Sequence, residues 1–202
     1  MKSLKRFLQA CVLIAVWCAL VPLSGAYAQS KSSPDIRVLM ERLNDPADTH
    51  PDTIERIVAI AKRDRNARQY AIDKLPDMIR GPQSDVWENA LRLAGKLRAK
   101  ETIPALIDVM SQPPLPAEKY LTFAGIERLD TDIVAKTLSQ IGDPAIPAVK
   151  GLLKSKDPRM RGRAILILKN IGSPSAREAL KQQRSVESDP ENVKLIDEKL
   201  GP

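Results

Sequence analysis

The chain of 202 residues carries 32 lysines and arginines against 25 aspartates and glutamates, which gives a formal net charge of +7. Only 3% of its residues are aromatic, and it has a single histidine. Sugar-binding and base-stacking sites usually need aromatic platforms, so this composition disfavours carbohydrate and nucleic acid as partners.

The first 28 residues have the order of a secretory signal peptide. Three basic side chains precede an apolar run from Ala10 to Val21, and Ala26-Tyr27-Ala28 ends the segment with a small residue on each side of a tyrosine. A membrane anchor is the rival interpretation, but crossing a bilayer takes about 20 apolar residues, and Pro22 interrupts this shorter run. We therefore predict cleavage after Ala28 and a periplasmic or secreted protein.

Removal of this segment would change the chemistry open to the chain. Both cysteines, Cys11 and Cys18, would leave with it, so disulfides, thiolate metal sites and a cysteine nucleophile are excluded from the predicted mature protein. The remaining 29 basic and 25 acidic residues give a net charge of +4. Such a mild excess is compatible with solubility and does not demand a polyanionic partner.

The apolar residues of the remaining chain follow a helical period almost throughout. The pattern predicts helices over six segments, with no stretch of sustained strand-like alternation: 36–43, 54–61, 71–78, 103–110, 133–141 and 160–171. Most prolines fall near a predicted helix start, where a missing N–H costs least. Pro76 is the exception, and we expect it to kink its helix or to divide it after Leu75.

A short sequence pattern occurs three times, in Leu97–Leu106, Ile141–Val149 and Ile171–Leu180. A recurring helix, tight turn and helix is typical of a stacked helical repeat array. In such an array Gly142 and Gly172 are turn residues at the joints between helices. The sequence thus predicts an all-α repeat protein, whose stacked helices present a surface for gripping another molecule.

The spacing of the copies predicts an insertion. Gly142 and Gly172 are 30 residues apart, whereas 44 residues separate the matched Arg98 from Gly142. Because Ile103–Met110 aligns with Ile146–Leu153 without gaps, one extra residue lies before this helix and the other 13 fall within 111–126. Helical spacing of apolar residues there indicates that the insertion carries a helix of its own.

The predicted domain organisation follows from these patterns. Residues 29–202 form one helical repeat domain, with its clearest repeats over 83–183 and a polar loop over 44–52. Residues 190–200, with apolar Val193, Ile196 and Leu200, form a final helix that closes the stack, as the ends of solenoids require.

One segment resembles a known family. It runs Asp157-Pro158-Arg159-Met160-Arg161-Gly162-Arg163-Ala164 and is followed by Leu168 and Ile171-Gly172. It is similar to a HEAT repeat of the short bacterial, PBS-lyase-like type. The resemblance implies a right-handed α-solenoid of the armadillo/HEAT kind, in which Asp157 and Arg161 bridge neighbouring repeats and second helices line the concave face. The earlier copies depart from this pair, with Gln83 and Trp87 and then Glu127 and Thr131 at the matched positions.

Signals for catalysis and cofactors are weak. His50 lies with Asp45, Asp48 and Asp52 in a loop that could bind a cation through oxygen ligands, but the glycine and distal glutamate of an EF-hand are missing. Loop and helix-capping roles fit these residues better, with Asp52 or Thr53 as the cap. There is no Gly-x-Ser-x-Gly turn and no glycine-rich phosphate loop, so we expect no enzyme, no cofactor and no metal. Some relatives suggested by the resemblance act on phycobilin chromophores or damaged DNA, but both roles are intracellular and disagree with export.

The strongest local asymmetry is one of charge. Between Lys150 and Arg184 there are ten basic residues and only two acidic ones. Lys150 and Lys154 are four residues apart, and Arg177, Lys181 and Arg184 follow i, i+4 and i+7, so each set is expected to form one helix stripe. We hypothesise that this basic surface binds an acidic protein segment or anionic lipid headgroups. A solvated face that only keeps the protein soluble is the alternative.

The insertion holds a second candidate site. Tyr120 and Phe123 are two of the four aromatic residues beyond position 28, and interface hot spots favour aromatic anchors. Packing against a neighbouring repeat would account for them equally well.

The sequence as a whole favours an exported, non-catalytic scaffold or adaptor that binds a protein partner. An accessory or cofactor-handling subunit of an envelope enzyme system is the alternative, and peripheral attachment to an anionic membrane is a further one. Composition and spacing do not determine the oligomeric state.

Overall fold

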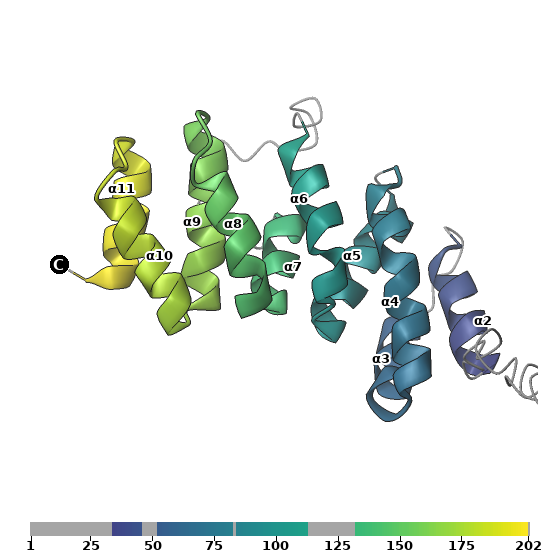
Figure 1. Ribbon diagram of the computed structural model, residues 1–202. Helices are drawn as coiled ribbons and strands as arrows, with labels where there is room; N and C mark the ends of the chain where they lie inside the picture. Colours follow the sequence, from purple (N-terminus) through teal and green to yellow (C-terminus); the bar gives the residue numbers. More distant parts are fainter. Residues whose placement is uncertain (1–33, 46–51, 83, 113–131, 202) are drawn as a thin grey trace, which may run out of the picture. The chain divides into compact units, whose positions relative to one another are not determined.

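The computed structural model describes residues 34–45, 52–82, 84–112 and 132–201, all within the compact unit Ser32–Pro202. Over these residues the chain is all-helical, as predicted (Figure 1). Ten α-helices follow one another in the described part: α2 (Pro34–Leu43), α3 (Thr53–Arg63), α4 (Arg65–Arg80), α5 (Asp85–Leu97), α6 (Ile103–Ser111), α7 (Ile133–Ile141), α8 (Ile146–Leu152), α9 (Pro158–Ile171), α10 (Pro174–Arg184) and α11 (Pro190–Leu200). None of these helices combines the length and the apolar character needed to cross a bilayer.

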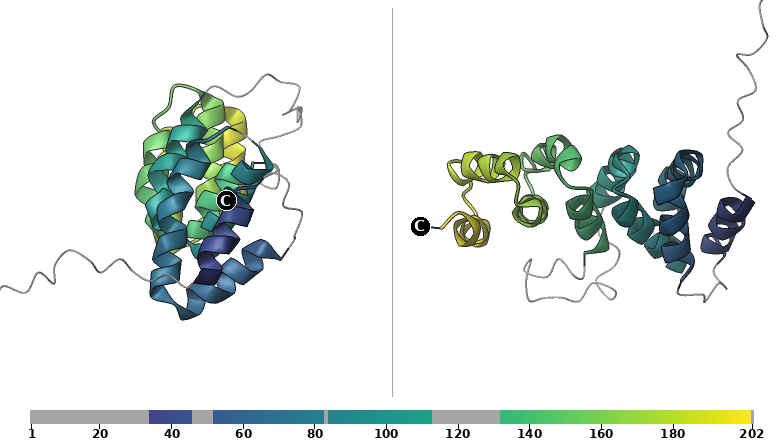
Figure 2. Two further views of the ribbon diagram at one scale, coloured as in Figure 1. Left: turned by 90° about the vertical axis from the view of Figure 1, so that its right-hand side faces the viewer. Right: turned by 90° about the horizontal axis from the view of Figure 1, so that it is seen from below.

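The helices stack in chain order as two adjoining rows. The first row consists of α3, α5, α7, α9 and α11, each in contact with the next, and the second row of α4, α6, α8 and α10 likewise (Figure 2). Across the rows, α4 packs against α3 and α5, α7 against α6, α9 against α8 and α10, and α10 against α11, while α2 lies against α3, α4 and α5. Every repeat therefore contacts its neighbours in sequence, which is the organisation of a helical repeat stack.

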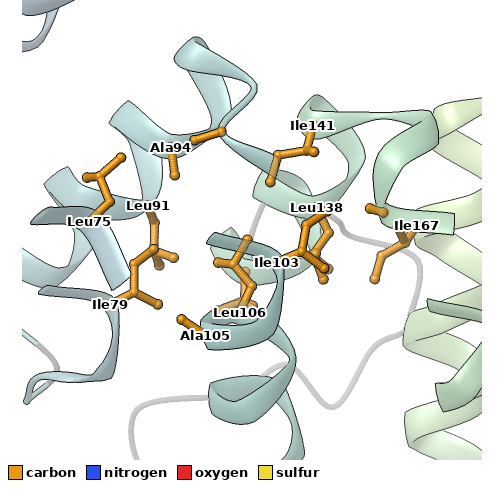
Figure 3. Close-up of a cluster of buried hydrophobic side chains, with 14 of the residues drawn as sticks. Leu75, Ile79, Leu91, Ala94, Ile103, Ala105, Leu106, Leu138, Ile141 and Ile167 are labelled. Atoms are coloured by element: carbon orange, nitrogen blue, oxygen red, sulfur yellow. The ribbon is translucent and has the colours of Figure 1, made fainter. Parts of the chain in front are cut away.

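The apolar period of each helix accounts for this packing, because every apolar face meets two or more neighbours. Leu91 of α5, Leu106 of α6 and Leu138 of α7 have no exposed surface and point into one cluster (Figure 3). Full burial of a leucine stabilises a fold by about 1.5–3 kcal/mol. Trp87 adds a polar tie between helices, since its indole N–H donates to the carbonyl of Ile79 at 3.0 Å. The core is therefore one continuous layer between the two rows.

The repeat register predicted from the sequence is confirmed. A 3₁₀ turn, Lys100–Thr102, directly precedes α6, and a second one, Asp143–Ala145, directly precedes α8. Both helices then begin with isoleucine and proline, at Ile103 and Ile146. The two segments therefore have the same local structure, position by position.

Aspartate and proline together start the last two helices of the first row, α9 and α11. Asp157 and Asp189 each accept a hydrogen bond from a backbone N–H of the first turn, and a proline follows each of them. Such caps contribute about 1 kcal/mol. Asp52, by contrast, precedes α3 without a side-chain capping bond, so the capping role considered for it is not fulfilled.

Pro76 does not divide its helix. Helix α4 runs unbroken from Arg65 to Arg80 with Pro76 inside it, so the predicted end after Leu75 is wrong. A proline removes one backbone hydrogen bond of the helix. Leu75 and Ile79, on either side of it, are fully buried, and their packing holds the helix together across that missing bond.

Four helices of the first row, α5, α7, α9 and α11, end on left-handed or otherwise positive-φ backbone, the last of them at Gly201 with φ 78°. Gly142 has φ 85° and Gly172 has φ 65°, which confirms both as turn residues. Arg98, the residue matched to Gly142 in the sequence, has φ 48° although it is not a glycine. Left-handed backbone costs a non-glycine residue about 1–2 kcal/mol. The joint between α5 and α6 therefore has the positive-φ backbone of the other joints, but with an arginine in place of the glycine that favours it.

The predicted final helix is present as α11, which packs against α9 and α10. Ile196 is fully buried, while Val193 and Leu200 are half-buried. The insertion expected within 111–126 and most of the loop over 44–52 lie outside the described residues. Ser111 itself is the last residue of α6.

A matched pair of substitutions tests the left-handed joints. Gly172→Ala should lower the free energy of unfolding by about 1 kcal/mol, because alanine disfavours this backbone. Arg98→Gly should leave stability unchanged or raise it by up to about 1 kcal/mol, since the same strain is relieved. Urea denaturation followed by circular dichroism measures both, and equal destabilisation by the two changes would contradict the prediction.

Candidate functional site

The basic segment from Lys150 to Arg184 divides into two groups in the structure. Four of its ten basic residues form ion pairs with acids on other elements: Arg161, Arg163, Lys169 and Arg184. Lys150 contacts a neutral amide, donating from Nζ to Oε1 of Gln182 at 3.4 Å. The other five make no ion pair with any described residue: Lys154, Lys156, Arg159, Arg177 and Lys181. The four bases in ion pairs are structural, and the other six, Lys150 among them, are available to a partner.

The strongest of these pairs joins α9 to the loop between α10 and α11. The guanidinium of Arg161 donates to both carboxylate oxygens of Glu187, with its shortest bond, Nη2 to Oε1, at 2.7 Å. The Glu187 side chain has no exposed surface, and it also accepts from Gln183 and from two backbone N–H groups of its own loop. The Arg161 hydrogen bond, outweighing the effect of burial, lowers the pKa of Glu187 from 4.5 to about 2.

Arg161 also fastens the preceding loop. Its Nη1 donates to the carbonyl oxygens of Ser155 and Lys156 at 3.0 and 3.3 Å. One guanidinium therefore ties the α8–α9 loop and the α10–α11 loop to the start of α9. This confirms that Arg161 bridges neighbouring repeats, as the resemblance implied.

Asp157 does not share that role. Its carboxylate caps α9 by accepting from the backbone N–H of Arg159 at 2.9 Å, and it forms no ion pair with Arg161. The expected bridge between Asp157 and the next repeat is therefore wrong. The cap explains the difference, because the carboxylate that completes the first turn of α9 is no longer free to leave it.

Arg163 forms a second bridge, toward the preceding repeat. Its Nε donates to Asp132 at the start of α7 at 2.6 Å, and its Nη1 donates to the carbonyl of Met110 near the end of α6 at 3.1 Å. One side chain of α9 therefore links the end of α6 to the start of α7.

The two predicted basic stripes are corrected in part. Helix α8 ends at Leu152, so Lys154 lies in the following turn and does not continue a helical stripe from Lys150. Arg184 pairs with Asp197 of α11, Nε to Oδ1 at 2.6 Å, and this places the flank of α10 that carries it against α11. Among the stripe residues of α10, only Arg177 and Lys181 remain unpaired.

A groove opens between α8 and α10 on the second row. It has a volume of about 560 Å³ and a largely apolar lining: Ile146, Pro147, Lys150, Ser175, Glu178 and Ala179. Glu178 is held on its own helix by a hydrogen bond from Gln182 at 3.1 Å. Lys150 and Glu178 thus belong to opposite walls, with apolar side chains between them.

Several candidate residues lie outside the described part of the chain: Tyr120, Phe123, His50 and Asp48. Their proposed roles stay predictions. Within the described ranges there is no group of three or more histidine, cysteine, aspartate or glutamate side chains placed to hold a metal ion.

Sequence reasoning missed the acidic partners Glu187, Asp197 and Glu198. They lie 13 to 29 residues from the bases they bind, beyond the reach of the i, i+4 spacing that guided the search. Lys169 donates to Glu198 at 2.6 Å and lowers its pKa. A count of acids in the final helix would have been the available signal, because neighbouring first-row helices face one another.

This arrangement of paired helices stacked in sequence defines an α-solenoid repeat protein. Residues 132–195, which cover α7 to the first half of α11, match the family described as HEAT repeats. The chain therefore carries HEAT repeats over this part, which confirms the family suggested by its Asp157–Gly172 segment. Among curated proteins no match to the chain was found. HEAT repeats generally mediate protein–protein interactions, which directs attention to the exposed faces of the stack.

The Arg161–Glu187 pair is expected to contribute to the free energy of unfolding, and its contribution should depend on pH in the acid range. Glu187→Gln should lower the free energy of unfolding by about 3 kcal/mol at pH 7, because it leaves a guanidinium without its counter-charge in a buried position. Glu198→Gln, in a more exposed pair, should destabilise the protein clearly less than Glu187→Gln does.

The sign of the pH effect follows from the lowered pKa of Glu187. The unfolded chain takes up a proton near pH 4.5 and the folded chain only near pH 2, so the stabilisation is complete above pH 4.5 and is lost as the pH falls toward 2. Urea midpoints measured between pH 7 and 2.5 should therefore fall more steeply for the wild type than for Glu187→Gln. Parallel curves would contradict this assignment.

Proposed function

We propose that the protein is an exported, non-catalytic scaffold that binds an acidic segment of another protein through the unpaired bases of its HEAT-repeat region. The observation that carries this proposal is the division of the basic segment into two groups. Structural needs account for four of its ten basic residues. They do not account for Lys154, Lys156, Arg159, Arg177 and Lys181.

The local balance of charge supports an acidic partner. The same segment holds only two acids, Asp157 and Glu178. Asp157 is engaged as a helix cap and Glu178 by Gln182. The bases without an ion pair outnumber these two acids, so the segment keeps a local excess of positive charge, and complementary charge across an interface speeds association and selects the partner.

A protein partner is favoured over the other polyanions. The segment offers no aromatic side chain on which bases could stack, and stacking is a main source of affinity for single-stranded nucleic acid. An anionic membrane surface would use the same lysines and arginines, and it is distinguished by experiment below.

Charge reversal tests the proposed surface. The double variant Lys154→Glu, Lys181→Glu should weaken binding of the partner at least about tenfold, which corresponds to about 1.4 kcal/mol. Its matched control is Lys62→Glu, Lys100→Glu, which makes the same change in net charge at exposed residues outside the segment. The partner is identified by cross-linking in intact cells and mass spectrometry, and its affinity is then measured at 50 and 300 mM salt.

Two results would count against this function. The partner could bind both double variants as tightly as the wild type, which would leave the basic surface without a role. Alternatively, the purified protein could bind vesicles containing phosphatidylglycerol but not pure phosphatidylcholine vesicles, and lose that binding on charge reversal. A membrane surface, and not a protein, would then be the ligand of these bases.

Export is tested separately. The order of charged, apolar and small residues in the first 28 positions supports removal of that segment. Amino-terminal sequencing of the protein recovered from a cell envelope fraction should therefore begin at Gln29. Recovery of the chain from the cytosol with Met1 or Lys2 at its start would contradict this prediction.

A further inference from the structure

We propose that the partner's acidic segment crosses the second row at Gly151, with its backbone against α8, an apolar side chain in the groove between α8 and α10, and carboxylates at Lys150, Lys154 and Lys181. This inference rests on the proposed function and specifies where, and with what kind of sequence, the partner binds.

Gly151 is the first observation. It is exposed, it lies in helix α8, and a methyl group added to it would meet no atom within 4 Å. It is not among the positive-φ glycines, so backbone conformation does not explain it either. Gly95, by contrast, packs directly against Gln140. Glycine has a lower helix propensity than alanine, and Gly151, the second-last residue of α8, gains neither a positive φ nor a packing contact in return. Such a residue is expected where another molecule lies close.

The position of Gly151 in the repeat is the second observation. Alignment of the copies places Asp108 of α6, Gly151 of α8 and Lys181 of α10 at one position of successive second helices. Asp108 is engaged by Arg80, Nη2 to Oδ2 at 3.1 Å. Lys181 is exposed and unpaired. At this repeat position, the second row therefore has no side chain on α8, at Gly151, and an unpaired lysine on α10, at Lys181.

The groove lies between these two points. Ile146, Pro147 and Ala179 provide an apolar lining between α8 and α10, which suits one apolar side chain of a chain that passes over Gly151. Pro147 is one helical turn before Gly151 on the same face of α8. A backbone crossing at Gly151 can thus deliver a side chain to the groove without bending away from the helix.

The charges around this path define the occupant. Lys150 precedes Gly151 directly, and the backbone N–H of Lys154 donates to the Gly151 carbonyl at 3.2 Å, so both lysines flank the glycine. Lys150 contacts only the neutral Gln182, and Lys154 has no acidic partner among the described residues. Glu178 on the opposite wall repels carboxylates from that side. The segment that fits is an extended acidic stretch with one apolar residue, its acids directed to α8 and to Lys181.

The experiment selects a ligand without assuming its identity. A phage-displayed library of random twelve-residue peptides is selected on the purified protein, and the enriched peptides are synthesised and titrated by fluorescence anisotropy. Enriched peptides should combine two or more acids with one apolar residue. Gly151→Ala should weaken their binding about tenfold, and Gly151→Leu more, because a side chain there displaces the backbone. Asp108→Ala and Asp108→Leu, at the same repeat position of α6, should change affinity by less than about twofold.

A measurement without ligand accompanies this test. Since the glycine serves no purpose within the chain, Gly151→Ala should raise the melting temperature by about 1–3 °C through helix propensity alone. A substitution that stabilises the fold while weakening binding is the signature of a contact site. A lower melting temperature would assign Gly151 a structural role and overturn the inference.

The remaining outcomes separate the two proposals. Peptides or a cross-linked partner that lose affinity on charge reversal at Lys154 and Lys181, but not on substitution of Gly151, would overturn the crossing point and leave the scaffold function standing. Failure to enrich any acidic peptide, together with binding that is indifferent to the charge reversal, would overturn both.

Discussion

The structure depends on the burial of each helix face against helices of the neighbouring repeats. No helix pair encloses its own apolar side chains, so Leu91, Leu106 and Leu138 from three different helices meet in one cluster (Figure 3). Stability therefore accumulates along the stack, as in other solenoids. The same dependence requires a closing element, and α11 meets it with buried Leu195 and Ile196 on one side and charged residues on the other.

Ion pairs and hydrogen bonds join neighbouring repeats in addition to the apolar contacts. Arg161 and Arg163 leave the same turn of α9 in opposite directions, one to Glu187 in the following loop and the other to Asp132 in the preceding repeat. Arg163 also donates to the carbonyl of Met110 near the end of α6, where acceptors have no partner in the helix, and Arg161 donates to two carbonyls of the α8–α9 loop. The arginines thus act as joints between repeats, and their charges are neutralised in place and contribute little to the outer field of the protein.

Once the basic residues in ion pairs are set aside, the remaining bases form a different surface from the one that the sequence suggests. A sequence count of ten bases suggests one uniform basic face, but the structure leaves unpaired bases at the α8–α9 junction and on α10, with Gly151 and an apolar groove between Lys154 and Lys181. That arrangement alternates cation, flat backbone, apolar hollow and cation. An extended peptide with acidic residues on either side of an apolar one would complement this order more closely than a flat anionic surface would.

The sequence alone determined the helices, the register of the repeats, the glycine joints and the closing helix, because these depend on local periodicity and on residues such as Gly172 and Pro190 that act within one turn. It left open whether Pro76 kinks or divides its helix, and it misjudged Asp157, because both effects depend on the surroundings: buried neighbours hold α4 together across the proline, and the start of α9 engages the aspartate. Only the tertiary structure decided which bases are paired, since Arg161 and Glu187 are 26 residues apart and meet because adjacent repeats stack. It also showed that Gly151 has no positive φ and that a side chain there would meet open space, a fact about the surroundings of a residue that no pattern along the chain records.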